Sequence, residues 1–118
     1  MEVTGTPFEK PITDNELKWI GVDLDKTLAN NSGYPNFDLL EPMEGAIDAI
    51  WEIVKRGFKI TIVTSRAYPD YHKIEAWCEK YNVPVRRIIC GKPLVRWMVD
   101  DRNIEFKGDW KETLTKIV

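Results

Sequence analysis

The sequence predicts an α/β domain built on a parallel sheet of four to five strands with helices on both faces. Short apolar runs alternate with amphipathic segments along the chain, which is the pattern of strands connected by helices. Several apolar runs end in polar side chains that can do chemistry, and parallel sheets bind ligands beyond the carboxyl ends of their strands. A chain of 118 residues has room for one such domain.

Composition narrows the class of protein. Hydrophobic residues make up 43% of the chain, enough for one core, and the net charge of -2 gives no basic field, so general binding to nucleic acid is not expected. Cys78 and Cys90 have no metal or redox spacing and are expected to be reduced. No apolar stretch resembles a signal peptide or a membrane span, which predicts a cytoplasmic protein with no membrane partner. Five tryptophans leave a homo-oligomer open.

The first part of the chain divides into an arm, a strand and a loop. Residues 1–16 mix Thr, Pro, Asp and Glu and are expected to form an N-terminal arm, whereas residues 17–118 form the single domain. Residues 19–24 are an apolar run bounded by turn residues, typical of a strand buried on both faces. Residues 29–41 are rich in Asn, Pro and Gly and predict a loop.

Three amphipathic helices are expected. The first begins at Pro42, shows apolar residues at helical spacing and ends before Gly57, a C-cap residue. The second covers residues 71–81. The last begins at Asp109, which together with Glu112 resembles a capping box.

The remaining apolar runs predict the other strands of a Rossmann-like sheet, at residues 58–63, 87–90, 97–99 and, as a fifth strand, 104–106. Residues 91–96 are too few for the helix that normally connects two parallel strands. We therefore expect an irregular connection there, or a marginal third strand.

Two aspartates, Asp23 and Asp25, follow the first strand one residue apart. Side chains alternate along a strand, so both carboxyl groups start on one side and can meet in one pocket. One carboxylate can act as a nucleophile while the other moves a proton. A pair of surface acids after a strand is the alternative interpretation of this short motif.

The other predicted strands also end in polar clusters. Thr64, Ser65 and Arg66 follow the second strand. Lys92 follows the third, and Asp100 and Asp101 follow the fourth. All would gather at one edge of a parallel sheet, where carboxylates suit Mg²⁺ and a hydroxyl with an ammonium can hold a phosphoryl group. Each cluster alone is compatible with a turn or a cap; their joint placement indicates a phosphate site.

These motifs resemble those of the haloacid dehalogenase superfamily. The match covers residues 20–101 and follows the order of the four motifs of that family. The first motif is Asp23-Leu24-Asp25-Lys26-Thr27, and it is followed by Thr64, Lys92 and Asp100-Asp101. The resemblance implies that Asp23 forms a phosphoaspartate, that Asp25 is the general acid and base, and that the phosphoryl group is bound by Thr64, Ser65 and Lys92. It also implies Mg²⁺ held by Asp23, Asp25 through its backbone carbonyl, Asp100 and Asp101.

The intervals between motifs are too short for the cap domain of many family members, so the chain is similar to small capless phosphatases. A departure from the family is Lys26, where many of its phosphatases have glycine. An uncapped site favours a large or extended substrate. Candidate substrate contacts at its rim are Arg66, Arg102, Tyr68 and His72.

The sequence thus predicts a Mg²⁺-dependent phosphomonoester hydrolase with a phosphoaspartyl intermediate, and leaves the phosphorylated substrate open. A receiver-like phosphoacceptor domain is a second hypothesis, although receivers place the acid pair first and a single acceptor aspartate mid-chain. A family member that binds phosphate or metal without turnover is a third.

Overall fold

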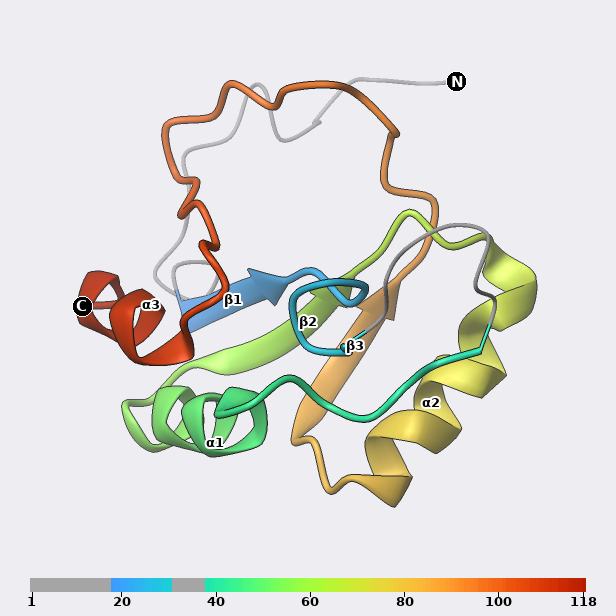
Figure 1. Cartoon of the computed structure of the whole chain (residues 1–118), viewed down its shortest axis with the longest axis horizontal. Helices are drawn as coiled ribbons and strands as arrows, with labels where there is room; N and C mark the ends of the chain where they lie inside the picture. Colours follow the sequence, from blue (N-terminus) through green and yellow to red (C-terminus); the bar gives the residue numbers. More distant parts are fainter. Residues whose placement is uncertain (1–17, 31–37) are drawn as a thin grey trace.

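The computed structural model describes residues 18–30 and 38–118. The predicted arm, residues 1–16, and most of the predicted loop, residues 29–41, lie outside the described residues. Within them the chain forms a parallel sheet with strand order β1-β2-β3. Its strands are β1 (Trp19–Val22), β2 (Lys59–Val63) and β3 (Val85–Ile89), which run side by side in the centre of Figure 1.

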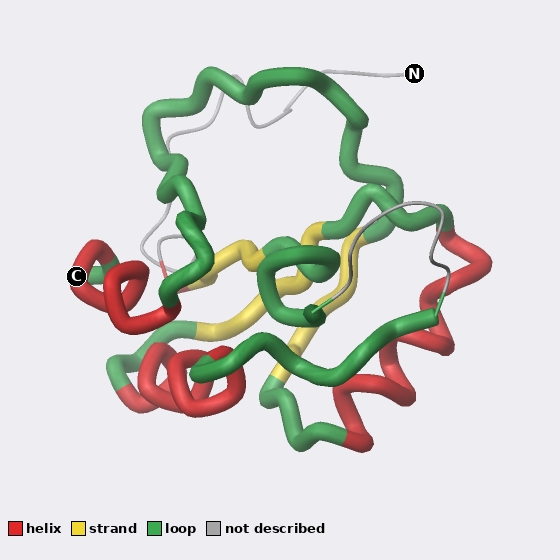
Figure 2. The backbone as a smooth tube through the Cα atoms, viewed as in Figure 1, coloured by secondary structure: helices red, strands yellow, loops and turns green. Residues whose placement is uncertain are grey.

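Helices connect and flank these strands (Figure 2). Helix α1 (Ala46–Lys55) lies between β1 and β2 in the chain. The short 3₁₀-helix η2 (Tyr68–Asp70) and α2 (Tyr71–Lys80) lie between β2 and β3. Helix α3 (Trp110–Lys116) ends the chain. The element order confirms the predicted α/β alternation up to β3.

The ends of α1 show how local sequence sets helix boundaries. Gly57 has φ 101° and donates to the carbonyl of Val54, while Phe58 donates to Ile53, so the predicted glycine ends the helix in a Schellman motif. The start lies later than predicted, at Ala46. Pro42 instead pairs with Ala29 in an isolated antiparallel bridge, which keeps it out of the helix.

Helix α3 begins as predicted. The side chain of Asp109 accepts from the backbone N–H groups of Lys111 and Glu112, which satisfies two donors that have no partner inside a helix. The carboxylate of Glu112 lies 3.2 Å from the Nζ of Lys116 and so supports the same helix from its exposed side.

The core lies on one face of the sheet. Parallel register pairs Ile20 with Ile60 and Val22 with Ile62, so these side chains share a face. They pack in one buried cluster with residues of α1, α2 and α3, among them Ile50, Ile53, Ile74, Trp77 and Trp110.

The opposite face mixes apolar and charged side chains, among them Trp19, Lys59, Val63 and Arg87. The guanidinium of Arg87 lies 4.2 Å from the ring centroid of Trp19, and the Nζ of Lys59 lies 5.4 Å from it. The described helices therefore share one face, whereas helices on both faces were predicted. The two connections run in the same direction across the sheet, and right-handed crossovers then place α1 and α2 on the same side.

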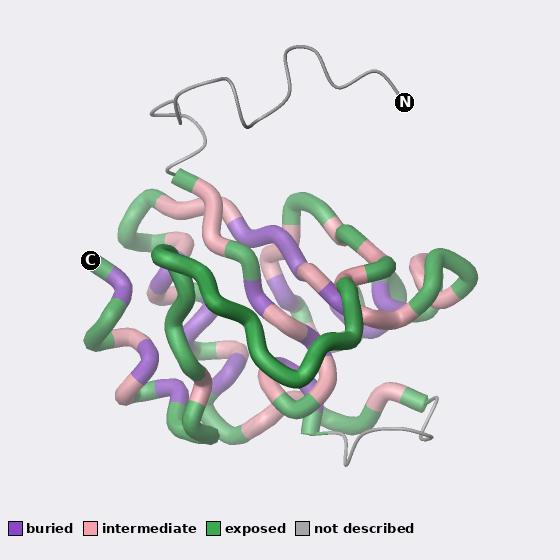
Figure 3. Tube along the Cα trace, turned by 90° about the horizontal axis from the view of Figure 1, so that it is seen from above, coloured by how far each residue is buried: buried purple, intermediate pink, exposed green. Residues whose placement is uncertain are grey.

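The predicted fourth and fifth strands, residues 97–99 and 104–106, are not strands in the structure. Segment 90–109 has no regular secondary structure and arches away from the sheet in Figure 1, and most of it is exposed in Figure 3. Trp97 is 77% exposed and Val99 99%. A parallel return takes about a dozen residues or more, and residues 91–96 are too few to carry the chain back to the start of a strand beside β1. The described sheet thus has three strands.

Among the described residues, no helix combines the length and the apolar character that crossing a bilayer requires.

Candidate functional site

The three strands deliver their polar clusters to one edge, as predicted. Beyond the strand ends the backbone stays paired: Thr64 donates to the carbonyl of Ile89 at 2.9 Å, and Lys92 donates to the carbonyl of Thr64 at 2.9 Å. Gly91 donates to the carbonyl of Arg66 at 2.9 Å. The clusters that follow β2 and β3 are therefore held together by main-chain hydrogen bonds rather than by side chains alone.

Asp23 is the carboxylate nearest to Lys92. Its Oδ1 accepts from the backbone N–H of Leu24 at 2.9 Å, and its Oδ2 lies 3.9 Å from the Nζ of Lys92. Burial raises the pKa of Asp23 above its usual value, and the negative charge of Asp25 adds to this. The ammonium of Lys92 and the Leu24 hydrogen bond pull the pKa of Asp23 the other way. The net result is a raised pKa for Asp23, a half-buried carboxylate that has the Lys92 ammonium close to it.

A tight turn follows Asp23 and sets the direction of Asp25. The carbonyl of Leu24 accepts from the N–H groups of Thr27, Leu28 and Ala29. Lys26 has φ 64°, a left-handed conformation that glycine adopts without strain and that is less favourable for lysine.

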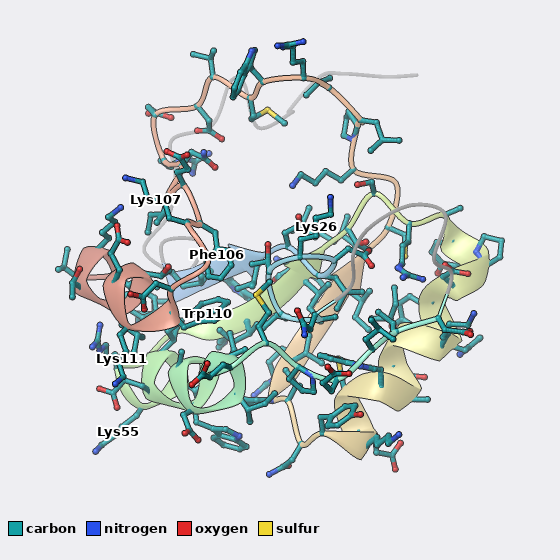
Figure 4. All side chains as sticks on the ribbon, in the orientation of Figure 1. Lys26, Lys55, Phe106, Lys107, Trp110 and Lys111 are labelled. Atoms are coloured by element: carbon teal, nitrogen blue, oxygen red, sulfur yellow. The ribbon has the colours of Figure 1, made fainter. Side chains whose placement is uncertain are left out.

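Helix α3 holds that turn from the side. The Nε1 of the buried Trp110 donates to the carbonyl of Thr27 at 2.9 Å. Phe106 lies against the Trp110 ring with 5.1 Å between centroids, and Figure 4 shows the two side chains together between α3 and the sheet. Residues at the far end of the chain thus fix the loop that carries the two aspartates.

Asp25 is bound to Arg66 through both carboxylate oxygens. Arg66 donates from Nη2 to Oδ1 at 2.8 Å and from Nε to Oδ2 at 2.9 Å. Its Nη1 donates to the Oδ2 of Asp70 at 3.1 Å. The hydrogen bonding of Arg66 to the Asp25 carboxylate is the main reason that the pKa of Arg66 is raised. The sequence predicted Arg66 as a rim contact for substrate; its side chain is only 9% exposed and lies inside the site.

Thr64 is buried, and its Oγ1 accepts from the backbone N–H of Arg66 at 3.1 Å. Ser65 is half-buried beside it. The structure thus places both predicted phosphate-binding hydroxyl residues in the turn that follows β2, next to the Asp25–Arg66 pair.

Asp100 and Asp101 lie on the exposed segment 90–109. The Oδ1 of Asp100 accepts from the backbone N–H of Arg102 at 2.9 Å, and this hydrogen bond lowers the pKa of Asp100. Asp101 lies 3.9 Å from the Nε of Arg102. Within residues 18–30 and 38–118, no three acidic, histidine or cysteine side chains are grouped so that they could hold a metal ion. The four predicted metal ligands are therefore not assembled in this conformation.

A groove of about 1070 Å³ connects the two acidic regions. It runs along β1 and is bordered by Asp23 and Lys92 on the sheet side and by Asp100 and Arg102 on segment 90–109. In the described chain β1 pairs only with β2, so the groove follows a free sheet edge.

Comparison with known proteins supports the fold. No protein-family model matches the chain, and no curated protein matches it significantly. The crystal structure of an MCSG target protein from Vibrio cholerae is similar, with 26% sequence identity and a TM-score of 0.60. The match covers 84% of this chain and 98% of that one. It shows that a small α/β fold of this kind occurs in a crystal structure.

The other predicted contacts lie outside this cluster. Tyr68 is exposed and stacks on Tyr71 with 5.6 Å between ring centroids, and His72 is exposed beside Glu75.

Sequence reasoning missed Asp70 and Trp110 as parts of the site. The spacing of four residues between Arg66 and Asp70 was visible in the sequence, but the sequence does not show that a helical turn brings the two side chains into contact.

Proposed function

We propose that this protein is a phosphomonoester hydrolase of the haloacid dehalogenase type, with Asp23 as the nucleophile. The observation that carries the proposal is the contact between Asp23 and Lys92 at the carboxyl edge of the sheet, with Asp25 in the adjacent turn. An ammonium 3.9 Å from a carboxylate can bind the same phosphoryl group that the carboxylate attacks.

The proposed reaction has two steps. A carboxylate oxygen of Asp23 forms a bond to phosphorus while the bond from phosphorus to the alcohol oxygen breaks, and the alcohol leaves with a proton from Asp25. Water then attacks the phosphorus of the phosphoaspartate, its proton passes to Asp25, and inorganic phosphate leaves as the Asp23 carboxylate is restored. Lys92 and the hydroxyls of Thr64 and Ser65 stabilise the charge on the phosphoryl oxygens.

Mg²⁺ is part of the proposal because the sequence motifs that contain Asp23, Asp25, Asp100 and Asp101 resemble those of Mg²⁺-dependent hydrolases. The described carboxylates do not fit a metal ion as they are arranged, so Asp100 on segment 90–109 would have to approach Asp23 before both could be ligands. When bound, the cation offsets the repulsion between an anionic substrate and an anionic nucleophile.

The uncapped architecture favours large or extended substrates. The groove along β1 offers contact area beyond the phosphoryl pocket, and remote contacts supply binding energy that a small ester lacks. The chemical class of the substrate is left open.

The deciding experiment measures phosphate release with Mg²⁺ from p-nitrophenyl phosphate and from a panel of nucleotides, sugar phosphates and phosphorylated oligonucleotides. Asp23→Asn should abolish turnover, because an amide is a very poor nucleophile. Asp48→Asn, on the exposed side of α1, is the matched control and should retain full activity. Full activity of Asp23→Asn would overturn the proposal.

A phosphoacceptor domain is the second candidate, and one contact favours it. Both oxygens of Asp25 are engaged by Arg66, and if this pair held Asp25 away from the phosphoryl group, the phosphoaspartate on Asp23 would persist. In that case a phosphoryl donor such as acetyl phosphate should label Asp23 stably. A phosphoaspartate that hydrolyses within the turnover time supports the hydrolase instead.

A further inference from the structure

Arg66 is the most extensively anchored charged side chain of the site. It donates two hydrogen bonds to Asp25 and a third to Asp70, and its side chain is nearly buried. A bidentate arginine–carboxylate pair fixes the plane of the carboxylate as well as its position.

The backbone of Arg66 is also held. Its N–H donates to the Oγ1 of Thr64 and its carbonyl accepts from Gly91, so the residue is tied both to the turn after β2 and to the chain after β3. Asp70 lies at the start of α2 and holds the third donor of the guanidinium. The orientation of Asp25 is therefore set by the sheet edge and by α2 together.

The pair with Arg66 does not bury the Asp25 carboxylate. Arg66 donates one hydrogen bond to each oxygen of the Asp25 carboxylate, and a carboxylate oxygen can accept more than one hydrogen bond. The Asp25 side chain keeps 29% of its surface exposed, so the carboxylate is accessible to water from the solvent side.

We propose that Arg66 is a positioning residue that holds Asp25 in place as the base for hydrolysis of the phosphoaspartate. This rests on the hydrolase function proposed above. In the step concerned, a water oxygen forms a bond to phosphorus, the bond from phosphorus to the Asp23 oxygen breaks, and the water proton passes to the Asp25 carboxylate. Arg66 does not touch the reacting atoms; it fixes the acceptor of that proton.

The test uses p-nitrophenyl phosphate with Mg²⁺, because its leaving group needs no proton and phosphorylation of Asp23 is then independent of Asp25. In Arg66→Ala we expect kcat to fall about 100-fold, the range of a lost general base. We expect KM to fall in parallel, so that kcat/KM changes by less than about threefold. The covalent phosphoenzyme should accumulate and be visible by intact mass.

Two further variants test whether the fall in kcat depends on the bidentate pair and on Asp25. Arg66→Lys keeps the charge but cannot form the bidentate pair, so its kcat should lie between those of the wild type and Arg66→Ala. Asp25→Asn should accumulate phosphoenzyme as well, and combining it with Arg66→Ala should reduce kcat no further, because both changes remove the same function.

Arg56→Ala is the matched control. Arg56 also joins an acidic side chain, Glu52, and donates to the carbonyls of Leu114 and Ile117, but it lies away from the strand ends. Its loss should lower stability and leave kcat and KM of the folded protein unchanged.

The outcomes separate the possible roles of Arg66. A rise in KM at constant kcat would assign Arg66 to substrate binding and overturn the positioning role, as would equal losses of kcat and kcat/KM without phosphoenzyme. Asp23→Asn in the same assay separates this proposal from the function itself. If that variant is inactive while Arg66→Ala keeps its kcat, only the positioning role is wrong; if it turns over like the wild type, the hydrolase is wrong too.

Discussion

The Nζ of Lys92 lies 3.9 Å from the Oδ2 of Asp23, although the two residues follow different strands, β3 and β1. The contact arises because the backbone hydrogen bond from Lys92 to the carbonyl of Thr64 holds Lys92 beside the end of β2, the strand that lies next to β1. It places a cation beside a carboxylate whose burial would otherwise favour its neutral form.

The first prediction concerns this contact. Lys92→Ala should reduce kcat/KM for phosphate esters about 100-fold or more, because a cation that stabilises transferring phosphoryl oxygens is lost. Lys111→Ala, an exposed lysine on α3, should leave kcat/KM unchanged. Equal activity of the two variants in a steady-state assay would remove Lys92 from the phosphate site.

The second prediction concerns the stability of metal-free protein and pH. The pKa of Asp23 is raised in the folded state, so folding is opposed by its charge at any pH above that folded pKa. At pH 7 in chelator, Asp23→Asn should be more stable than the wild type, by less than about 1 kcal/mol because the side chain is partly solvated. The gain should vanish as pH falls below about 4, where the carboxyl is protonated in both states. Urea denaturation at both pH values measures it; a gain that grows on acidification would contradict the assignment.

The third prediction concerns the turn after Asp23. Trp110→Phe removes the donor to the carbonyl of Thr27 and should lower the free energy of unfolding by about 1–3 kcal/mol. It should also reduce kcat, since the turn carries Asp25. Trp51→Phe is the control: Trp51 donates to the carbonyl of Asn82 in the same way, but on the surface, where water can replace it. Equal destabilisation of both variants in urea would argue against a special role for Trp110.

The fourth prediction concerns Mg²⁺. If Asp100 becomes a ligand, segment 90–109 must move, and the exposed Trp97 should change its fluorescence as Mg²⁺ is added. Trp97→Phe should remove that signal, and Asp100→Ala should shift the titration to higher Mg²⁺ and lower the activity, since a charged oxygen ligand is lost. Full activity in excess chelator would exclude the metal from the mechanism.

The fifth prediction concerns the two thiols. Burial raises the pKa of Cys78 to about 12, so almost no thiolate is present at pH 8, whereas Cys90 is more accessible. A thiol reagent should therefore modify Cys90 first and Cys78 only after denaturation. Peptide mapping of the modified protein identifies the order, and prior labelling of Cys78 would show that α2 opens readily.

Much of the site was predictable because strand ends are local features. An apolar run that stops at Asp23, Thr64 or Lys92 indicates where a strand ends, and parallel strands bring those ends to one edge. The capped start of α3 at Asp109 and the end of α1 at Gly57 were predictable for the same reason, since each depends on a few neighbouring residues.

The sequence alone therefore determined the α/β alternation up to β3, the end of α1, the start of α3 and the gathering at one edge of the polar residues that follow the three strands, because periodicity and capping are encoded locally. Only the tertiary structure decided that Arg66 pairs with Asp25, that Trp110 holds Thr27, and that residues 97–99 stay apart from the sheet. The side-chain pairs depend on which distant segments meet, which no local stretch of the chain specifies; the short connection at 91–96 indicated an irregular link but not that residues 97–99 leave the sheet.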